Sequence, residues 1–492
     1  MQQGRDAILR ALRQVEDQIA HGDRGAETLC RRADCLVQLG RVDAARQQHL
    51  ETLQLHPDHF ATLINFGTLL YESDFRTAAR SVFERAVRRY PEEPVAHVNF
   101  ANVLMYAGEP ELARLHCEFA LDFDPYNLGA HQRLSELWRE AGNMAAMRHH
   151  YRLGFATAPP RVLPHLGDGE PIRLLLLSST PGADVGWRRL VDRERFSVTE
   201  ITAEFFDPST PLPPHDLVFN AIGDADLAPE AIAAAEVLAA RTAAPVLNPP
   251  ARVAVTGRMA AARRLGDLPG VTAPRMAQLR RAQLTGADAP SVLAAHGFTD
   301  YPLLLRSPGF HTGRHFVRVE TPKALAASAN ALPGDDLLVI QHLDATGADG
   351  YARKYRVMLI GGELYPLHLA ISTDWKVHYF TGAMSGDAAL QAEEARFLND
   401  MAAALGPSAM AALGAIQSRL GLDYGGVDFA LDADGRLLLF EANAVMTIVL
   451  PDASPQWDYR RPAIQRAMEA AQAMLIARSK IKPKTTPVEV AQ

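Results

Sequence analysis

The sequence predicts a multidomain protein in which an all-α array of repeated helix pairs precedes a region where strands and helices alternate. Three observations support this fold class. A 34-residue period runs through the first third of the chain, short apolar runs follow a Pro- and Gly-rich segment, and an acidic hairpin lies near the C-terminal end. The chain has 492 residues, which is enough for roughly two to four domains.

The overall composition limits the possible function classes. Hydrophobic residues make up 48% of the chain and charged residues 22%, which is typical of globular domains. The net charge of −7 argues against a nucleic-acid binder. Three cysteines are too few for a disulfide framework, and no apolar run has the character of a signal peptide or a membrane span. We therefore expect a cytoplasmic protein with no nucleic-acid or membrane partner.

The first element is an internal repeat over residues 1–160, with four 34-residue units that begin near residue 26. Prolines, turn residues and small residues recur at this period: Pro57, Pro91, Pro125 and Pro159; Gly40, Asp74, Gly108 and Gly142; Ala33, Gly67, Ala101 and Ser135. Small residues let two helices approach closely, and proline ends the second helix of each pair. The pattern resembles the tetratricopeptide repeat.

Arrays of this kind present a concave surface that usually binds a peptide or a protein. The resemblance therefore implies a peptide or protein partner on residues 26–160. The alternative is a packing or dimerisation module with no separate ligand.

Residues 161–171 are rich in Pro and Gly and are predicted to be a linker. Beyond the linker, three apolar runs are typical of buried strands and one Ala-rich stretch is typical of a helix: 172–178, 216–220, 245–248 and 229–241. Strands that alternate with helices imply a parallel, Rossmann-like α/β layer over 172–250. The glycines after the first strand do not form a dinucleotide fingerprint, which disfavours a nicotinamide site.

The segment 422–445 is predicted to be a β-hairpin. Asp434-Gly435 favours a two-residue turn, because both positions tolerate the positive φ angles of that turn. With this turn, Phe429 lies opposite Phe440, which is a favourable cross-strand aromatic pair. The turn also fixes the register of the other pairs.

On the other face of this hairpin, the same register places Asp428 directly opposite Glu441. Two opposed carboxylates among apolar neighbours are costly unless a cation lies between them. Asn443 shares this face, and carboxylate and amide oxygens suit Mg²⁺. A protonated carboxyl pair and a pair bridged by arginine are the alternatives.

The spacing of Asp428, Glu441 and Asn443 resembles the metal-binding signature of ATP-grasp enzymes, which include D-alanine–D-alanine ligase, glutathione synthetase and the ribosomal-protein glutamate ligases. The resemblance implies that these residues hold Mg²⁺, or Mn²⁺, against the phosphates of ATP. It also implies an α/β pre-ATP-grasp domain over 172–250 and an α+β ATP-grasp domain over 251–480. Residues 481–492 are expected to be a disordered tail.

Resemblance to this family also implies phosphate-binding residues upstream. Arg306 ends a predicted strand, 301–306, where the family has a lysine, and Arg258 matches the approximate place of a second phosphate-side lysine. Gly309 and Gly313 make the following loop flexible, and its backbone N–H groups can cradle phosphate. Surface salt bridges are the alternative for both arginines.

The stretch 337–343 resembles the strand and hinge whose backbone contacts the adenine edge of ATP. This resemblance places Gln341, His342 and Leu343 at the nucleotide base. Family members usually carry glutamate where Gln341 stands. Glutamine can still accept a hydrogen bond, so the replacement of glutamate by glutamine is compatible with nucleotide binding.

Two further basic residues follow. A predicted hairpin about Gly361-Gly362 carries Arg356, and in the glutamate-ligase branch a similar hairpin faces the nucleotide. Lys376 matches a basic position that glutathione synthetase presents to substrate and γ-phosphate, and Gly382 matches the glycine that ends that stretch. His378 stands where the family often has asparagine.

The resemblance implies an ATP-dependent ligase that joins a carboxylate to an amine, or to a related nucleophile, through an acylphosphate. ADP and phosphate are released, and Arg306, Lys376 and Arg356 are the implied catalytic residues. A catalytically weak nucleotide-binding scaffold and an ATP-grasp kinase are the alternatives.

Overall fold

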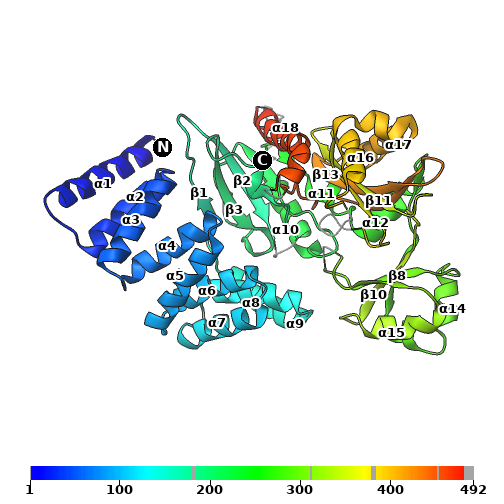
Figure 1. The fold of residues 1–492 in the computed structure, drawn as a ribbon, viewed down its shortest axis with the longest axis horizontal. Coiled ribbons are helices and arrows are strands. Elements are labelled where there is room, and N and C mark those ends of the chain that lie inside the picture. The colour runs from blue at the N-terminus through cyan, green and yellow to red at the C-terminus, as the bar shows by residue number, and fades with distance from the viewer. Residues whose placement is uncertain (1, 180–182, 311–312, 378–383, 452–453, 481–492) are drawn as a thin grey trace, which may run out of the picture. The chain divides into compact units, whose positions relative to one another are not determined.

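A computed structural model describes residues 2–179, 183–310, 313–377, 384–451 and 454–480 (Figure 1). The chain divides into two compact units. The first unit is Met1–Pro159 with the short pieces Pro164–Pro171 and Arg193–Arg195, and the second is Pro160–Leu163, Ile172–Asp192 and Phe196–Gln492. The expected disordered tail, 481–492, lies outside the described residues. No helix of the described ranges is both long and apolar enough to cross a membrane.

The first unit is a helical repeat array that resembles tetratricopeptide repeats. Its described part contains nine consecutive helices: α1 (Gln2–Ala20), α2 (Ala26–Gln38), α3 (Val42–Leu55), α4 (Phe60–Glu72), α5 (Arg76–Arg89), α6 (Pro94–Tyr106), α7 (Pro110–Phe123), α8 (Leu128–Glu140) and α9 (Met144–Phe155). The even-numbered helices α2 to α8 begin 34 residues apart, and so do the odd-numbered helices α3 to α9. The predicted period is therefore the period of the helix pairs.

The recurring turn and small residues have the roles that their size predicts. The four residues of the turn column all have positive φ angles: Gly40 (73°), Asp74 (68°), Gly108 (76°) and Gly142 (79°). In the small-residue column, a Cβ atom added to Gly67 would lie 2.6 Å from the ring of Phe83 on the paired helix. The sequence therefore specifies both the reversal of the chain and the close approach of the two helices.

The second unit begins with a five-stranded sheet in the order β1-β3-β2-β4-β5. Its strands, and the helices after them, are β1 (Arg161–Leu163), β2 (Ile172–Ser178), η1 (Trp187–Arg189), β3 (Phe196–Thr202), η2 (Ala203–Phe205), β4 (Leu217–Asn220), α10 (Pro229–Ala239), β5 (Val246–Leu247) and α11 (Pro250–Val253). Strands β2 to β5 are parallel and β1 is antiparallel to β3. The predicted parallel layer is present.

Two strands of this sheet differ from the predictions. Strand β1 lies inside the stretch predicted to be a linker, where it covers the edge of β3. Strand β3 carries Thr and Glu at partly buried positions, so its apolar signal is weaker than that of β2. Both strands gain their order from pairing with neighbours that are distant in sequence.

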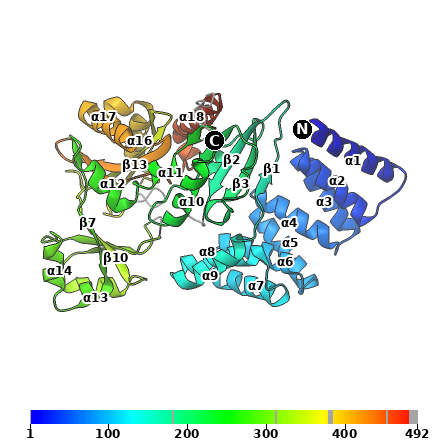
Figure 2. The ribbon, with the colours of Figure 1, turned by 180° about the vertical axis from the view of Figure 1, so that it is seen from behind.

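The next part of the second unit contains an antiparallel four-stranded sheet in the order β7-β10-β8-β9 (Figure 2). Its elements are β7 (Met276–Arg280), α13 (Arg281–Thr285), α14 (Ala289–Ala295), β8 (Leu303–Arg306), β9 (Phe316–Val319), η3 (Pro322–Ala324), α15 (Leu325–Asn330) and β10 (Asp336–Gln341). One face of this sheet packs with the helices around Leu305, Leu293 and Leu325. The opposite face carries Leu304, Leu338 and Ile340.

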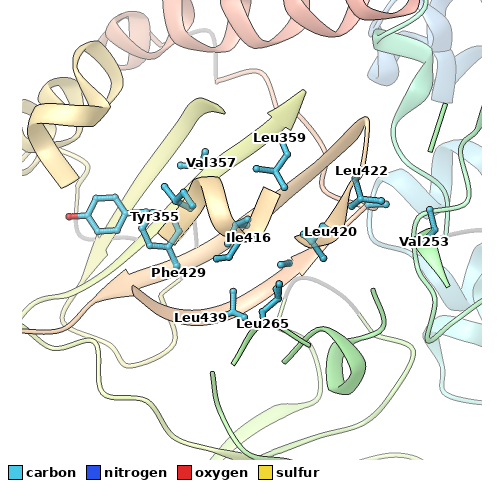
Figure 3. Packing of buried hydrophobic residues seen from close by; sticks show 14 of the residues in the cluster. Val253, Leu265, Tyr355, Val357, Leu359, Ile416, Leu420, Leu422, Phe429 and Leu439 are labelled. Atoms are coloured by element: carbon cyan, nitrogen blue, oxygen red, sulfur yellow. The ribbon is translucent and has the colours of Figure 1, made fainter. Parts of the chain in front are cut away.

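A mixed five-stranded sheet, in the order β12-β11-β13-β14-β6, completes the second unit. Its elements are α12 (Arg258–Leu265), β6 (Val271–Thr272), β11 (Ala352–Ile360), β12 (Glu363–Ser372), α16 (Ala388–Asn399), α17 (Met401–Leu420), β13 (Tyr424–Leu431), β14 (Leu437–Asn443), η4 (Pro455–Arg460) and α18 (Arg461–Ser479). Figure 3 shows Ile416 and Leu420 of α17 in the same apolar core as Val357, Phe429 and Leu439 of the sheet.

Helices α16 and α17 follow each other directly along the chain. They meet at Asp400, whose backbone leaves the helical region at φ −142°. The Asp400 side chain accepts a hydrogen bond from the N–H of Ala403 at 3.0 Å, so it caps the start of α17.

Asn248 connects the first sheet of the second unit to β13. Its side chain accepts hydrogen bonds from the N–H groups of Asp423 (3.0 Å) and Tyr424 (2.9 Å) and donates to the Tyr424 carbonyl (2.8 Å). Its own carbonyl accepts from Asn220 of β4 at 3.0 Å. Since Asn248 is fully buried, these contacts fix the first sheet to the start of the hairpin strand.

Candidate functional site

One cavity of about 430 Å³ in the second unit collects most of the predicted site residues. Its lining comes from the second and third sheets, from helix α12 and from loops. The predicted residues that line the cavity are Arg258, Arg306, Gly313, Gln341, His342, Leu343, Arg356, Lys376, Asp428, Glu441 and Asn443. Gly309 does not line it, and a Cβ atom added there would lie 3.7 Å from the side chain of Leu227.

Two predicted residues, His378 and Gly382, lie outside the described residues. The predicted hairpin about Gly361-Gly362 is the β11–β12 pair.

The hairpin β13–β14 has the predicted Asp428–Glu441 pair but a different turn. Its loop is one residue longer than predicted and is closed by a hydrogen bond from the Asp432 N–H to the Arg436 carbonyl at 3.0 Å. The Asp432 side chain stabilises this longer loop, because it accepts from the N–H groups of Asp434 and Arg436.

As a result, the predicted pairing of Phe429 with Phe440 is wrong. Phe429 lies opposite Leu439, and a β-bulge leaves Phe440 as an extra residue between Leu439 and Glu441. The bulge restores the register, so Asp428 still lies opposite Glu441. Phe440 faces the cavity instead of packing on Phe429.

Asp428 is held by two basic side chains of the neighbouring strand β11. Arg356 donates to both carboxylate oxygens, with Nε–Oδ1 at 2.6 Å and Nη2–Oδ2 at 2.8 Å, and Lys354 Nζ lies 3.4 Å from Oδ2. Burial alone would raise the pKa of Asp428, but the charges of Arg356 and Lys354 outweigh it and hold the pKa well below its usual range. This carboxylate is therefore charged, although its side chain is only 4% exposed.

Glu441 has a different arginine partner. Arg258 Nη2 lies 2.6 Å from its Oε1, and the Asn443 amide donates to the same oxygen at 2.8 Å. Of the alternatives for the opposed carboxylates, the structure shows arginine pairing, with one arginine on each acid. Arg258 is also not in a surface salt bridge, because its side chain is 15% exposed.

The donor set of Asp428, Glu441 and Asn443 fits a hard divalent cation chemically. Two carboxylates and one amide line the cavity from paired positions of β13 and β14. Within the described ranges, no group of three or more His, Cys, Asp and Glu side chains is placed to hold a metal ion. A cation at this set would therefore need oxygen ligands from a bound phosphate as well.

A row of three cations, defined as Arg258, Arg306 and Lys376, lies along the cavity. Arg306 is 9% exposed, and burial followed by the charge of Arg258 lowers its pKa to about 10. Burial and the charge of Arg306 lower the pKa of Lys376 in turn. Arg306 donates to the carbonyl of Phe310, and the Lys376 ammonium donates to the carbonyl of Phe316 at 3.5 Å. Like charges held this close are stabilised when an anion binds between them.

Next to the cation row is an apolar wall. Leu304 and Ile340 pack with Met276, Phe316 and Trp375, and all five line the cavity. The Phe316 and Trp375 rings meet edge-to-face with centroids 5.4 Å apart. The wall combines residues from β7, β8, β9 and β10 with a loop residue. Its members are distant in sequence, so no local motif reveals it.

The predicted adenine-side residues lie at the edge of this wall. The Gln341 side chain accepts from the Arg275 N–H at 3.1 Å, so its carbonyl oxygen has a role within the protein. His342 meets Trp375 at a centroid distance of 6.5 Å, and burial followed by the charge of Arg318 lowers the pKa of His342. A neutral imidazole at this position suits an uncharged ring system.

Sequence reasoning also missed Lys354 and His368. Lys354 lies two residues before Arg356 and therefore shares its strand face, and His368 pairs with Arg356 across β11 and β12. Burial lowers the pKa of His368 well below its usual value. Strand alternation around Arg356 is the signal that predicts both positions.

Comparison with known proteins gives matches only among solved structures, because no protein-family model and no curated protein matches the chain. A MamA fragment from Desulfovibrio magneticus RS-1 is 22% identical, with a TM-score of 0.28, over 29% of this chain and 81% of that chain. TTC0263, a thermophilic TPR protein of Thermus thermophilus, is 20% identical, with a TM-score of 0.27, over 30% of this chain and 81% of that chain.

YrrB, described as a TPR protein with an unusual peptide-binding site, is 16% identical, with a TM-score of 0.26, over 28% of this chain and 72% of that chain. TM-scores this low carry no argument about function. The repeat architecture of this chain rests on the register of its own helices.

Proposed function

We propose that the second unit is an ATP-grasp ligase that binds ATP with Mg²⁺ and joins a carboxylate to an amine. The single observation that carries the proposal is the row of three cations between an apolar wall and the carboxylate–amide set. A nucleoside triphosphate has matching parts in the same order: a flat base, a chain of phosphates and a divalent cation. The cavity volume of about 430 Å³ accommodates such a ligand.

Each group of residues has a task in this function. The wall around Phe316 and Trp375 packs against the base, and the cation row binds the phosphates. Mg²⁺, when bound at Asp428, Glu441 and Asn443, neutralises charge on the β- and γ-phosphates. For Mg²⁺ to bind, Arg356 must break its hydrogen bond to at least one carboxylate oxygen of Asp428. The freed Arg356 N–H can then donate to a phosphate oxygen.

The reaction needs positioning and charge stabilisation from the protein, not a protein nucleophile. A substrate carboxylate oxygen attacks the γ-phosphorus, and the bond to the β–γ bridging oxygen breaks, which releases ADP. The amine then attacks the acyl carbon, the carbon–oxygen bond to phosphate breaks, and the phosphate leaves with the proton from nitrogen. Arg306 and Lys376 stabilise the charge on the transferred phosphoryl group.

The helical array has a separate proposed role. We infer that it binds a peptide or protein that is the substrate or carries it, because stacked helix pairs form an extended surface of this kind. Deleting residues 1–160 would leave turnover of a free small substrate intact and lower turnover of a peptide-linked one.

The proposal is tested by ATP binding and by product analysis on the full chain. Calorimetry with ATP and Mg²⁺ should show binding that Arg306→Met weakens about 10- to 100-fold, since a buried charged partner of phosphate is lost. The control is Arg173→Met, which removes an exposed ion pair with Asp216. Absence of magnesium-dependent ATP binding would overturn the proposal.

Products distinguish the two alternatives. ADP release that depends on an added acid and amine, with an amide product, supports the ligase. A stable phosphorylated acceptor would identify a kinase. Tight ATP binding without turnover would identify a nucleotide-binding scaffold, which the bidentate Arg356–Asp428 pair specifically favours because it occupies both carboxylate oxygens.

A further inference from the structure

The cavity has a second end whose chemistry differs from the cation row and the apolar wall. This end is formed by Asp184, in the loop between β2 and β3, and by Val445, Met446, Thr447 and Val449, which follow β14. No residue of this set belongs to the proposed nucleotide site. We define these five residues as the acidic end of the cavity.

Asp184 is set apart from the other acids that line the cavity. Asp428 and Glu441 are paired with arginines, and Asp344 accepts from the Thr346 N–H while facing Arg318 and His342. The Asp184 oxygens accept only from the Ser179 N–H, each at 3.0 Å, and no basic side chain in the described part of the chain bonds to them. Among the described residues, Asp184 therefore has no cationic partner.

The acidic residues around Asp184 strengthen the attraction of this end for a cation. Glu200 and Glu204 lie close enough that, after burial itself, their charges help to raise the pKa of Asp184 to about 8. The Glu204 carboxylate accepts from the Ser179 hydroxyl at 3.1 Å, so a second acid contacts the residue whose N–H donates to Asp184. The charges of Glu200 and Glu204 add to the attraction for a cation, but of these three acids only Asp184 lines the cavity.

The acidic end is held in place by close backbone packing. Val185 donates to the Ala221 carbonyl and Gly223 donates to the Ala183 carbonyl, both at 2.8 Å, which extends the sheet beyond β4. A Cβ atom on Gly186 would lie 2.9 Å from Thr447, and one on Gly223 would lie 2.7 Å from the backbone of Val445. These two glycines therefore allow the 445–449 segment to close this end of the cavity.

The apolar side chains at this end indicate what accompanies the cation. Val445, Met446 and Val449 provide an aliphatic surface next to a single carboxylate. A hydrated metal ion needs several oxygen ligands, whereas an alkylammonium ion needs one carboxylate and an apolar surface for its carbon chain.

We propose that the acidic end binds the amine substrate of the ligase, a primary alkylamine whose ammonium group lies against Asp184 and whose carbon chain packs on Val445, Met446 and Val449. That the amine is a substrate rests on the proposed ligase function, but the binding of an amine at this end does not. This end adjoins the carboxylate–amide set, because the Val445 N–H donates to Asn443 Oδ1 at 3.1 Å, so the amine is held beside the phosphate chemistry. The Asp184 carboxylate takes one proton from the ammonium group before the nitrogen attacks the acyl carbon. The five residues therefore set specificity for the amine and not for ATP.

The test measures binding of n-propylammonium to the full chain without nucleotide, by ligand-observed NMR. At a pH of about 9, where Asp184 with its pKa of about 8 is charged, the unmodified protein should bind n-propylammonium at least about tenfold more tightly than 1-propanol, because only the ammonium ion pairs with the carboxylate. Asp184→Asn should remove that preference. Asp207→Asn is the matched control, because Asp207 is an exposed acid of the same unit that accepts from Ser209.

The outcomes separate the two proposals. Equal binding of n-propylammonium by Asp184→Asn and the unmodified protein, or no binding at all, would overturn the inference. Displacement of n-propylammonium by millimolar Mg²⁺ or K⁺ would instead identify a metal site and also overturn it. ATP titration of the same samples should give the same ATP affinity in both variants. If no sample binds ATP, that result would count against the ligase and not against the ammonium site.

Discussion

The two units of the chain differ in how they treat buried ionisable groups. The helical array buries neutral groups: the thiols of Cys30 and Cys117, whose pKa values burial raises to about 11 and 12, and imidazoles such as His49, whose pKa burial lowers to about 4. The second unit buries charged groups in pairs, with Arg356 on Asp428 and Arg460 on Glu394. The contrast teaches that these charges can be buried because each is paired, whereas Arg306 in the cavity is buried with only a carbonyl as its bonded partner among the described residues.

The largest expected effect is the loss of one partner from the Asp428 pair. Arg356→Met should destabilise the second unit by about 3–5 kcal/mol, because it leaves a buried carboxylate with only Lys354 nearby. Hydrogen exchange in increasing urea, read by mass spectrometry, reports each unit separately. The first unit should be unchanged, and Arg173→Met should cost about 0–1 kcal/mol because its ion pair is exposed. Equal effects of both variants would contradict the comparison.

The next effect is steric and lies in the helical array. Gly67→Ala should destabilise the first unit by about 1–3 kcal/mol, because the new Cβ meets the ring of Phe83. Adding Phe83→Leu should recover part of the loss, since the flexible side chain can move away. Gly414→Ala is the control, because a Cβ there meets nothing in helix α17 and should stabilise the second unit slightly. A neutral Gly67→Ala would show that the helices do not pack this closely.

The stability of the first unit should also depend on pH through its buried histidines. His116 and His150 each bond to another histidine of the same repeat, Nδ1 to Nδ1 at 2.9 Å, and burial followed by that neighbour lowers their pKa values to about 4. The unfolded chain binds these protons near the usual pKa of about 6.5, so the first unit should lose stability as pH falls from 6.5 towards 4. The expected loss is about 1–2 kcal/mol per pair, because the imidazoles are partly solvated.

An earlier repeat provides the matched variant for this pH test. Leu63 and Val82 occupy the positions that His97 and His116 occupy one repeat later, and they pack in one apolar cluster. The double variant His97→Leu, His116→Val should flatten the pH dependence of urea unfolding in the first unit. An unchanged slope between pH 6.5 and 4 would show that other groups cause it.

The smallest expected effect concerns the turn column. Asp74 adopts a φ of 68°, which costs a residue with a side chain more than it costs glycine. Asp74→Gly should therefore stabilise the first unit by about 0.5 kcal/mol, after the loss of an exposed ion pair with Arg76. Gly108→Asp is the reverse change and should lower the melting temperature of the same unit.

The helical array could be predicted from sequence almost completely, because each repeat depends on contacts with its neighbours. Position in the period was enough to assign Gly40 and Asp74 to turns and Gly67 to a helix contact. The parallel strand β2 was equally clear, since its run of buried leucines is a local signal.

The cavity was only partly predictable. The Asp428–Glu441 pair followed from the hairpin, but the turn and the Phe429–Phe440 pair did not, because the side chain of Asp432 stabilises a longer loop. The partners Arg356 and Lys354 come from β11, whose place beside β13 is a property of the sheet order and not of local sequence. The wall around Trp375 was missed for the same reason.

The bulge in β14 has one more consequence. Strand alternation would send either Phe440 or Glu441 into the apolar core, and the extra residue lets both face the cavity while Leu439 and Ala442 remain in the core. Phe440 therefore contributes to the shape of the ligand chamber without supporting the protein's interior. Substitutions that change the size of the side chain at this position should therefore change the volume of the cavity without disturbing the core.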